Sequence, residues 1–296
     1  MSNLPFRPLQ FGDITIDRCV ESEGDFFPAA MFFPDSTEAM IDAQRDWLEP
    51  HFMKPKSIGG GMLGGIFTYV IRTDRHTILV DTCVGNDKER TMTPNWHMKQ
   101  TGWLDDLRAM GVAPESVDFV MCTHLHVDHV GWNTQLVDGR WVPTFPNARY
   151  IFHKTEYEAW EKSQDNPAMD GCFKDSVLPV VEAGNADLVT SDYAVNDAIW
   201  LEPSPGHTPG HVCINLKGGG KHALFTGDSF HHPLQVAYPE WSSAFCSDKQ
   251  MSADTRHRIV EKLCDTDSYM MAAHFAAPTA GRVVANGDRC KLQVDE

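Results

Sequence analysis

Three histidines and one aspartate lie within six consecutive residues, HLHVDH at residues 124–129. Neutral imidazole and carboxylate are the ligands that borderline divalent metal ions prefer in proteins. His124 and His126 are two residues apart, so on an extended segment their side chains point to the same side and can bind one ion. Asp128 and His129 follow where the chain turns, and they can bind a second ion. The alternative interpretation is a polar surface loop that happens to be rich in histidine.

The elements around this cluster are predicted strands that end in chemically active residues. The apolar run VDFVMC at residues 117–122 precedes the cluster, which places the cluster in the loop at the C-terminal end of a buried strand. Four other short motifs end or follow predicted strands in the same way: ILVDT at 78–82, PGH at 205–207, TGD at 226–228 and AAH at 272–274. Because each candidate lies at a strand's C-terminal end, all of them can converge on one edge of the fold. This convergence favours a metal site over a polar loop.

The HLHVDH segment resembles the HxHxDH signature of the metallo-β-lactamase superfamily, and the four other motifs match that family's motifs in order. The resemblance runs from about Ile66 to about His274. It implies an α/β fold, an αββα sandwich with two sheets face to face and helices outside, which agrees with strand hairpins that alternate with amphipathic helices. It also implies a dinuclear centre in which one ion is bound by His124, His126 and His207, the other by Asp128, His129 and His274, with Asp228 bridging them.

The implied chemistry is hydrolysis by a metal-bridging hydroxide. Two divalent ions lower the pKa of a shared water towards about 7, which supplies hydroxide at neutral pH. Asp128 can bind a metal and accept or relay a proton. Zinc is the expected metal because it suits imidazole and has no redox chemistry, although manganese, iron or cobalt could occupy the same ligands. The resemblance further implies that Asp81 orients a ligand histidine, and that His211 is structural.

The substrate class follows from a narrower resemblance, to the branch that holds N-acyl-homoserine lactonases and methyl parathion hydrolases. Lactonases of that branch hold the substrate oxygen with a tyrosine shortly after the bridging aspartate, and here His231 takes its place. We therefore expect opening of a lactone or cleavage of a carboxylic ester, with His231 as hydrogen-bond donor. Trp132 and Phe230 are candidate walls of the substrate pocket. The alternatives are an organophosphate triesterase, a glyoxalase II-like thioester hydrolase and a non-catalytic metal-binding protein.

Composition limits the partners of the protein. The chain has 296 residues, 42% of them hydrophobic, and a formal net charge of -16. A surface this acidic repels phosphate backbones, so we expect a small-molecule substrate and no nucleic acid. We see neither a signal peptide in the first residues nor an apolar segment long enough to span a membrane. The eight cysteines are scattered and contain no C-x-x-C pair, which predicts reduced thiols in a cytoplasmic protein.

We expect a single metallo-β-lactamase-like domain over residues 1–296, with residues 1–55 as an N-terminal arm. Within this arm, residues 26–34 are aromatic and interrupted by prolines, which argues against a regular helix or a central strand. The run can pack on the core as an extended segment, form a wall of the substrate pocket or make a dimer contact. We expect the rings of residues 26–33 to be exposed, which favours a homodimer.

Overall fold

The computed structural model describes residues 5–165 and 171–295. Residues 1–4, which begin the segment searched for a targeting signal, lie outside the described residues. The chain forms two compact units. Unit 1 comprises the described parts of Met1–Arg7, Ser22–Gly65 and Ala194–Glu296, and unit 2 comprises Pro8–Glu21 and Ile66–Tyr193. That the whole chain forms a single domain stays a prediction.

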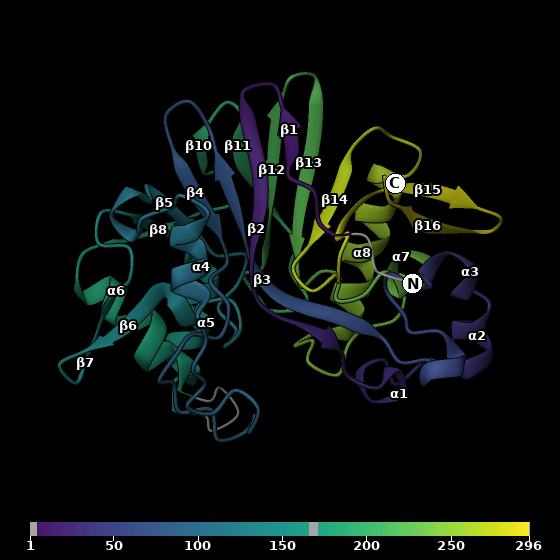
Figure 1. Cartoon of the computed structure of the whole chain (residues 1–296), viewed down its shortest axis with the longest axis horizontal. Coiled ribbons are helices and arrows are strands. Elements are labelled where there is room, and N and C mark those ends of the chain that lie inside the picture. The colour runs from purple at the N-terminus through teal and green to yellow at the C-terminus, as the bar shows by residue number, and fades with distance from the viewer. Residues whose placement is uncertain (1–4, 166–170, 296) are drawn as a thin grey trace. The chain divides into compact units, whose positions relative to one another are not determined.

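A seven-stranded sheet lies mainly in unit 2, with the strand order β1-β2-β3-β4-β5-β8-β9 (Figure 1). The strands are β1 (Leu9–Phe11), β2 (Ile14–Asp25), β3 (Leu63–Arg72), β4 (Thr77–Val80), β5 (Phe119–Met121), β8 (Arg149–His153) and β9 (Ala186–Val189). Strands β4, β5, β8 and β9 pair in parallel. Parallel neighbours end at the same edge of a sheet, so the residues that follow β4 and β5 are brought together.

Unit 2 also contains the hairpin of β6 (Thr134–Val137) and β7 (Arg140–Pro143). Its helical segments are α4 (Trp103–Ala109), η2 (Pro114–Ser116), η3 (Gly131–Asn133), α5 (Lys154–Ser163), η5 (Phe173–Val177) and α6 (Leu178–Glu182). Their apolar faces pack against the sheet in one hydrophobic core, which includes Trp103, Leu107, Val120 and Tyr150. Strands covered in this way read as continuous apolar runs, as at residues 117–122.

Unit 1 contains a second seven-stranded sheet, of order β10-β11-β12-β13-β14-β15-β16. The strands are β10 (Ala194–Asn196), β11 (Ile199–Pro203), β12 (Val212–Gly218), β13 (Lys221–Gly227), β14 (Tyr269–Ala272), β15 (Ala280–Asn286) and β16 (Arg289–Gln293). Strands β13 and β14 are parallel, with Leu224 opposite Met270. Their shared edge therefore brings the residues after β13 next to those after β14. The last hairpin, β15-β16, is yellow in Figure 1.

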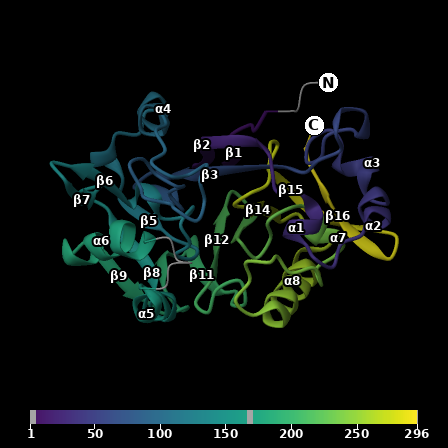
Figure 2. The same ribbon diagram turned by 90° about the horizontal axis from the view of Figure 1, so that it is seen from below.

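The helical segments of unit 1 are α1 (Ala29–Phe32), α2 (Glu38–Asp42), α3 (Arg45–Leu48), η1 (Lys56–Ile58), α7 (Leu234–Ala237) and α8 (Lys249–Leu263). Helix α8 begins after Asp248, whose side chain accepts a hydrogen bond from the backbone N–H of Met251. Its residues Ile259 and Leu263 are buried in the core of this unit with Leu224 and Met270. Helix α7 contacts β16, and α8 contacts β15 (Figure 2).

The aromatic run near the N-terminus differs from the expectation. Residues 29–32 form the short helix α1 after Pro28, rather than an irregular segment throughout. Phe32 and Phe33 are buried, with 3% and 0% exposure, and Phe26 and Phe27 are partly buried against the same core. The expectation that these rings are exposed is therefore wrong, because they cover the core of unit 1 instead. Among the helices in the described ranges, none is both long and apolar enough to cross a membrane.

Candidate metal centre

The candidate side chains follow the ends of strands, as the sequence predicts. In unit 2, Asp81 directly follows β4, and residues 123–129 follow β5 after a single intervening residue. In unit 1, Asp228 follows β13, His274 follows β14 and His207 lies in the loop after β11. Within each unit, the parallel pairing of two of these strands places their candidates at one edge of a sheet.

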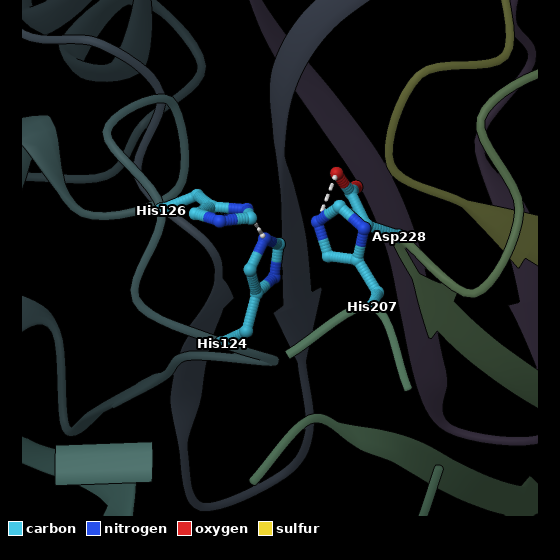
Figure 3. A group of neighbouring side chains, drawn as sticks. All are labelled: His124, His126, His207 and Asp228. Atoms are coloured by element: carbon cyan, nitrogen blue, oxygen red, sulfur yellow. Dashed lines mark hydrogen bonds and ion pairs between the residues drawn. The ribbon is translucent and has the colours of Figure 1, made fainter. Parts of the chain in front are cut away.

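In unit 2, the imidazole rings of His124 and His126 approach each other closely (Figure 3). The distance between Nε2 of His124 and Nδ1 of His126 is 2.9 Å, and the ring planes are 84° apart. The ring of His124 is buried, whereas that of His126 is partly exposed. Two ring nitrogens at this distance share a proton or a cation, so both can bind the same metal ion.

The carboxylate of Asp81 organises two of the histidines in unit 2. Its Oδ1 accepts a hydrogen bond from the backbone N–H of Thr123 at 2.8 Å, and its Oδ2 accepts one from the Thr123 hydroxyl at 2.9 Å. The same Oδ2 lies 2.9 Å from Nδ1 of His129. Because the hydroxyl proton of Thr123 is given to Asp81, the hydroxyl oxygen accepts from Nδ1 of His124, 3.1 Å away. Both rings therefore carry their proton on Nδ1 and present Nε2 as a lone pair, the form that binds a metal.

Asp128 lies beside the ring of His129. The distance from its Oδ1 to Nε2 of His129 is 3.7 Å. The Asp128 side chain keeps 14% of its surface exposed, whereas that of His129 keeps 1%. A carboxylate that is open to solvent next to a buried imidazole can accept a proton and pass it to water.

In unit 1, three imidazoles surround the buried carboxylate of Asp228. Nε2 of His207 lies 3.3 Å from Oδ2, Nε2 of His231 lies 3.2 Å from the same oxygen, and Nε2 of His274 lies 3.1 Å from Oδ1. Figure 3 shows the ring of His207 with its nitrogen directed at this carboxylate. The backbone N–H of Asp228 donates to Nε2 of His211, which leaves that histidine in a structural role. Asp228 is thus presented to several imidazole nitrogens at once.

The protonation pattern of these imidazoles fits a bound cation. Nδ1 of His274 donates to the backbone carbonyl of Gly65 at 3.0 Å, so a neutral ring turns the Nε2 lone pair towards Asp228. A lone pair facing an ionised carboxylate at 3.1 Å is repulsive unless a proton or a metal ion lies between them. The donors are imidazole nitrogens and carboxylate oxygens, the set that zinc and similar divalent ions bind. The residues present therefore fit a divalent metal.

His231 differs from the other histidines of unit 1. Burial lowers the pKa of its ring below the usual value, although Asp228 opposes the shift, so the ring is neutral at neutral pH. Nε2 of His231 lies 3.2 Å from Oδ2 of Asp228, but neither ring nitrogen of His231 makes a hydrogen bond in the part of the chain that the structure describes. The backbone N–H of His231 is held by Oε1 of Gln235 at 2.7 Å. His231 is therefore a buried neutral imidazole beside the candidate bridging carboxylate, and its ring nitrogens are not committed to another hydrogen bond.

Aromatic rings from the N-terminal arm pack on two of these imidazoles. The ring of Phe32 lies 5.1 Å from that of His231, and the ring of Phe26 lies 5.9 Å from that of His274. Gly64 makes this packing possible, because a Cβ atom there would lie 2.5 Å from the ring of Phe26. The aromatic run at residues 26–34 was a candidate wall of the substrate pocket in the sequence, and that role stays a prediction.

The two rings proposed as pocket walls lie within the hydrophobic cores. Trp132 stacks on Trp103 with ring centres 5.2 Å apart, and its Nε1 donates to Glu21 at 2.8 Å. Phe230 is fully buried in the core of unit 1. Their role as pocket walls stays a prediction. Sequence reasoning did not single out Thr123 or Cys246, which contact candidate ligands and carry no motif of their own.

Comparison with known families and proteins adds independent information. The family model described as Metallo-beta-lactamase superfamily matches residues 61–263. An N-acyl homoserine lactonase from Bacillus sp is 28% identical over 205 residues, which cover 63% of this chain and 74% of that protein. An N-acyl homoserine lactonase from Bacillus cereus is 27% identical over 164 residues, and the match spans 51% of this chain and 58% of that protein.

Solved structures match nearly the whole chain. The hydrolase AbOPH of the beta lactamase superfamily has a TM-score of 0.79 at 20% identity, and the match covers 100% of this chain and 99% of that one. AidC, described as a dizinc quorum-quenching lactonase, has a TM-score of 0.76 at 17% identity, with 99% of this chain and 98% of that one covered. These likenesses and the family match confirm the predicted αββα sandwich of the metallo-β-lactamase type.

Proposed function

Because the chain belongs to the metallo-β-lactamase superfamily and is a metal-dependent hydrolase, we propose that it opens a lactone or cleaves a carboxylic ester at a dinuclear metal centre. The observation that carries the proposal is Asp228, a buried carboxylate with the Nε2 atoms of His207, His231 and His274 within 3.3 Å. The ligands that we propose from the family resemblance are His124, His126 and His207 for one ion and Asp128, His129 and His274 for the other, with Asp228 serving both.

The metal we propose is zinc, two ions per chain. The five imidazoles and two carboxylates among the proposed ligands match its preference for nitrogen and oxygen donors, and manganese, iron or cobalt can use the same set. Three of the imidazoles, those of His124, His129 and His274, have Nδ1 bonded to an oxygen atom, so Nε2 is available to the metal. Hydrogen bonds of this kind fix the ring orientation and make the histidine a better ligand.

Each side chain of the site has a defined task in this proposal. Two divalent ions held by these residues would supply an activated water and polarise the target oxygen. Asp128, whose carboxylate reaches solvent, accepts the proton that is released as the new bond to the substrate forms. His231 donates its Nε2 proton to the oxygen that becomes negative in the transition state. Asp81 keeps the ring of His129 in the orientation and tautomer that bind metal.

The substrate that fits this arrangement best is a neutral ester with an apolar part. The net charge of -16 disfavours anionic substrates such as phosphate monoesters. Phe26 and Phe32 provide apolar surface directly beside the imidazoles of His274 and His231. The curated relatives are described as N-acyl homoserine lactonases, and an N-acyl lactone combines a neutral cyclic ester with an apolar chain. We therefore place lactones first and aryl esters second.

A hydrolysis panel on metal-loaded protein tests the proposal. It compares N-acyl lactones of increasing chain length, aryl esters, thioesters and phosphotriesters, each with and without a chelator. We expect chelator-sensitive turnover that is fastest for a lactone, and loss of that turnover in Asp228→Asn. His153→Ala is a matched control, because Nε2 of His153 is bonded to Ser191 and the residue lies outside the candidate set. Faster turnover of phosphotriesters or thioesters would show that the substrate is not a lactone or a carboxylic ester. Turnover that neither a chelator nor Asp228→Asn reduces would overturn the proposal.

A further inference from the structure

His207 differs from the other candidate metal ligands in what its second ring nitrogen contacts. Nδ1 of His207 lies 3.7 Å from the sulfur of Cys246. The corresponding nitrogens of His129 and His274 face a carboxylate and a backbone carbonyl, and that of His124 faces a hydroxyl. A thiol is a weaker acceptor than these oxygens, so the orientation of His207 depends on how firmly the sulfur is held.

The sulfur of Cys246 is held by a chain of hydrogen bonds that begins at a buried arginine. Nη1 of Arg256 donates to Oγ of Ser252 at 2.6 Å, and this hydroxyl lies 3.3 Å from the sulfur. Because the Ser252 oxygen accepts from Arg256, its proton is available to the sulfur. Oγ of Ser243 lies 3.4 Å from the sulfur and can accept the thiol proton. Burial lowers the pKa of Arg256 to about 10, so the chain keeps its cationic end at neutral pH.

The backbone holds the same two segments together. The N–H of Ser247 donates to the carbonyl of His207 at 2.9 Å, and the N–H of Asp248 donates to the carbonyl of Gly206 at 2.9 Å. Gly206 has a φ of 128°, and a Cβ atom there would lie 2.2 Å from the backbone nitrogen of Ser252. The loop that carries His207 is therefore held by backbone hydrogen bonds against the segment that leads into α8, and Cys246 belongs to that segment.

We propose that Cys246 is a positioning residue that accepts the Nδ1 proton of His207 and thereby directs Nε2 towards the metal and Asp228. The inference rests on the proposed function, since it treats His207 as a metal ligand. Without the sulfur, the ring loses an acceptor for its Nδ1 proton, and a ring protonated on Nε2 cannot bind a metal through that nitrogen. The loss of such an outer hydrogen bond typically lowers metal affinity by about 10- to 100-fold.

The test compares three cysteine variants by metal binding. Cys246→Ala removes the acceptor, Cys246→Ser replaces it with a hydroxyl that also accepts, and Cys213→Ala removes a buried thiol of the same unit that contacts Thr226 and Ser229 instead. The readouts are competition for zinc with a chromogenic chelator and the visible absorption spectrum of the cobalt-loaded protein. We expect weaker metal binding, by about 10- to 100-fold, and a changed cobalt spectrum in Cys246→Ala. Cys246→Ser should recover most of the affinity, and Cys213→Ala should match wild type.

The outcomes separate this inference from the function on which it rests. Wild-type affinity and spectrum in Cys246→Ala overturn the role of Cys246 and leave the metal centre intact. An equal loss in Cys213→Ala also overturns it, because the effect would then come from lost packing in unit 1. A wild-type protein that binds no metal after reconstitution overturns the proposed function itself. If Cys246→Ala is too unstable to purify, Cys246→Val takes its place, and a cobalt spectrum of Cys246→Ser that is identical to that of Cys246→Val counts against the inference, since the serine hydroxyl accepts a hydrogen bond and the valine side chain cannot.

Discussion

At the scale of single residues, the chemistry depends on which nitrogen of each imidazole carries the proton. Asp81 and Thr123 place the proton of His129 and His124 on Nδ1, and the carbonyl of Gly65 does the same for His274. His231 differs, because neither of its ring nitrogens has a hydrogen-bond partner among the described residues, although Nε2 lies 3.2 Å from Asp228. His124, His129 and His274 therefore present lone pairs, whereas we propose that His231 presents a proton. This proposed difference would separate the ligands from the hydrogen-bond donor.

The variant His231→Ala tests that separation. We expect the metals to stay bound, because Asp228 keeps His207 and His274 beside it. The value of kcat should fall by roughly 10²–10³, the effect of one lost donor to a developing oxyanion, with little change in KM. Steady-state kinetics and elemental analysis on the same sample measure both quantities. Full activity with the metals in place would show that another group holds the substrate oxygen.

The variant Asp81→Asn tests a different role, the orientation of the metal-binding histidines. Asp81 accepts three hydrogen bonds, one from the Thr123 backbone N–H at Oδ1 and two, from Thr123 Oγ1 and His129 Nδ1, at Oδ2. An amide NH₂ group cannot accept, so the variant loses one of these bonds if the NH₂ group replaces Oδ1 and two if it replaces Oδ2. We expect metal affinity to fall by about 10- to 100-fold, measured by chelator competition. Unchanged affinity would mean that the packing around His129 is sufficient to orient the ring.

At the scale of elements, buried lysine and arginine side chains hold the irregular loops in place by hydrogen bonds. In unit 2, Nζ of Lys88 donates to Thr134 Oγ1 at 2.6 Å and to the carbonyl of Asp175 at 3.1 Å, so the loop after β4 is tied to β6 and η5. Arg90 makes two hydrogen bonds to the Asp175 carboxylate, at 2.6 and 2.9 Å. Arg256 has the same function in unit 1 for the segment between β13 and α8.

Lys88 makes stability depend on pH in a defined direction. Burial lowers its pKa to about 7 in the folded chain, although Asp175 favours the charged form. The unfolded chain therefore binds more protons between about pH 7 and 10, so the contribution of Lys88 to the free energy of unfolding rises with pH in that range, by at most about 1.4 kcal/mol per unit. Urea unfolding of wild type and Lys88→Met at pH 6.5 and 9 measures this. A difference between the two proteins that does not grow with pH contradicts the expectation.

At the scale of the whole molecule, the proposal requires two metal ions per chain. Protein purified without chelator, or reconstituted, should contain about two equivalents by elemental analysis. A ligand at 100 times its dissociation constant stabilises the folded state by about 2.7 kcal/mol, so a chelator should lower Tm in wild type and much less in Asp228→Asn. A stoichiometry that stays near one or zero would remove the dinuclear model.

The predicted homodimer also concerns the whole molecule. It was inferred from an aromatic arm that was expected to be exposed, and the rings of Phe32 and Phe33 are buried in unit 1. The dimer stays a prediction, now without support from these rings. Light scattering that gives only the mass of one 33.2 kDa chain would remove it.

The sequence by itself determined where the candidate residues lie along the chain, at the ends of strands, and it predicts which of them carry the chemistry. An apolar β-forming run followed by HLHVDH is a local pattern, and local patterns determine strand ends. The structure accordingly places Asp81, residues 123–129, Asp228 and His274 at the ends of β4, β5, β13 and β14. The family match over residues 61–263 agrees with the resemblance drawn from the same motifs.

Only the tertiary structure decided what holds each imidazole. His129 meets Asp81 across 48 residues of sequence, His207 meets Cys246 across 39, and His274 meets the carbonyl of Gly65 across 209. Such contacts arise from the pairing of distant strands and the packing of loops, and no periodicity in the sequence encodes them. The aromatic arm behaves in the same way, because the burial of Phe32 depends on the core that it meets and not on its own neighbours in the chain.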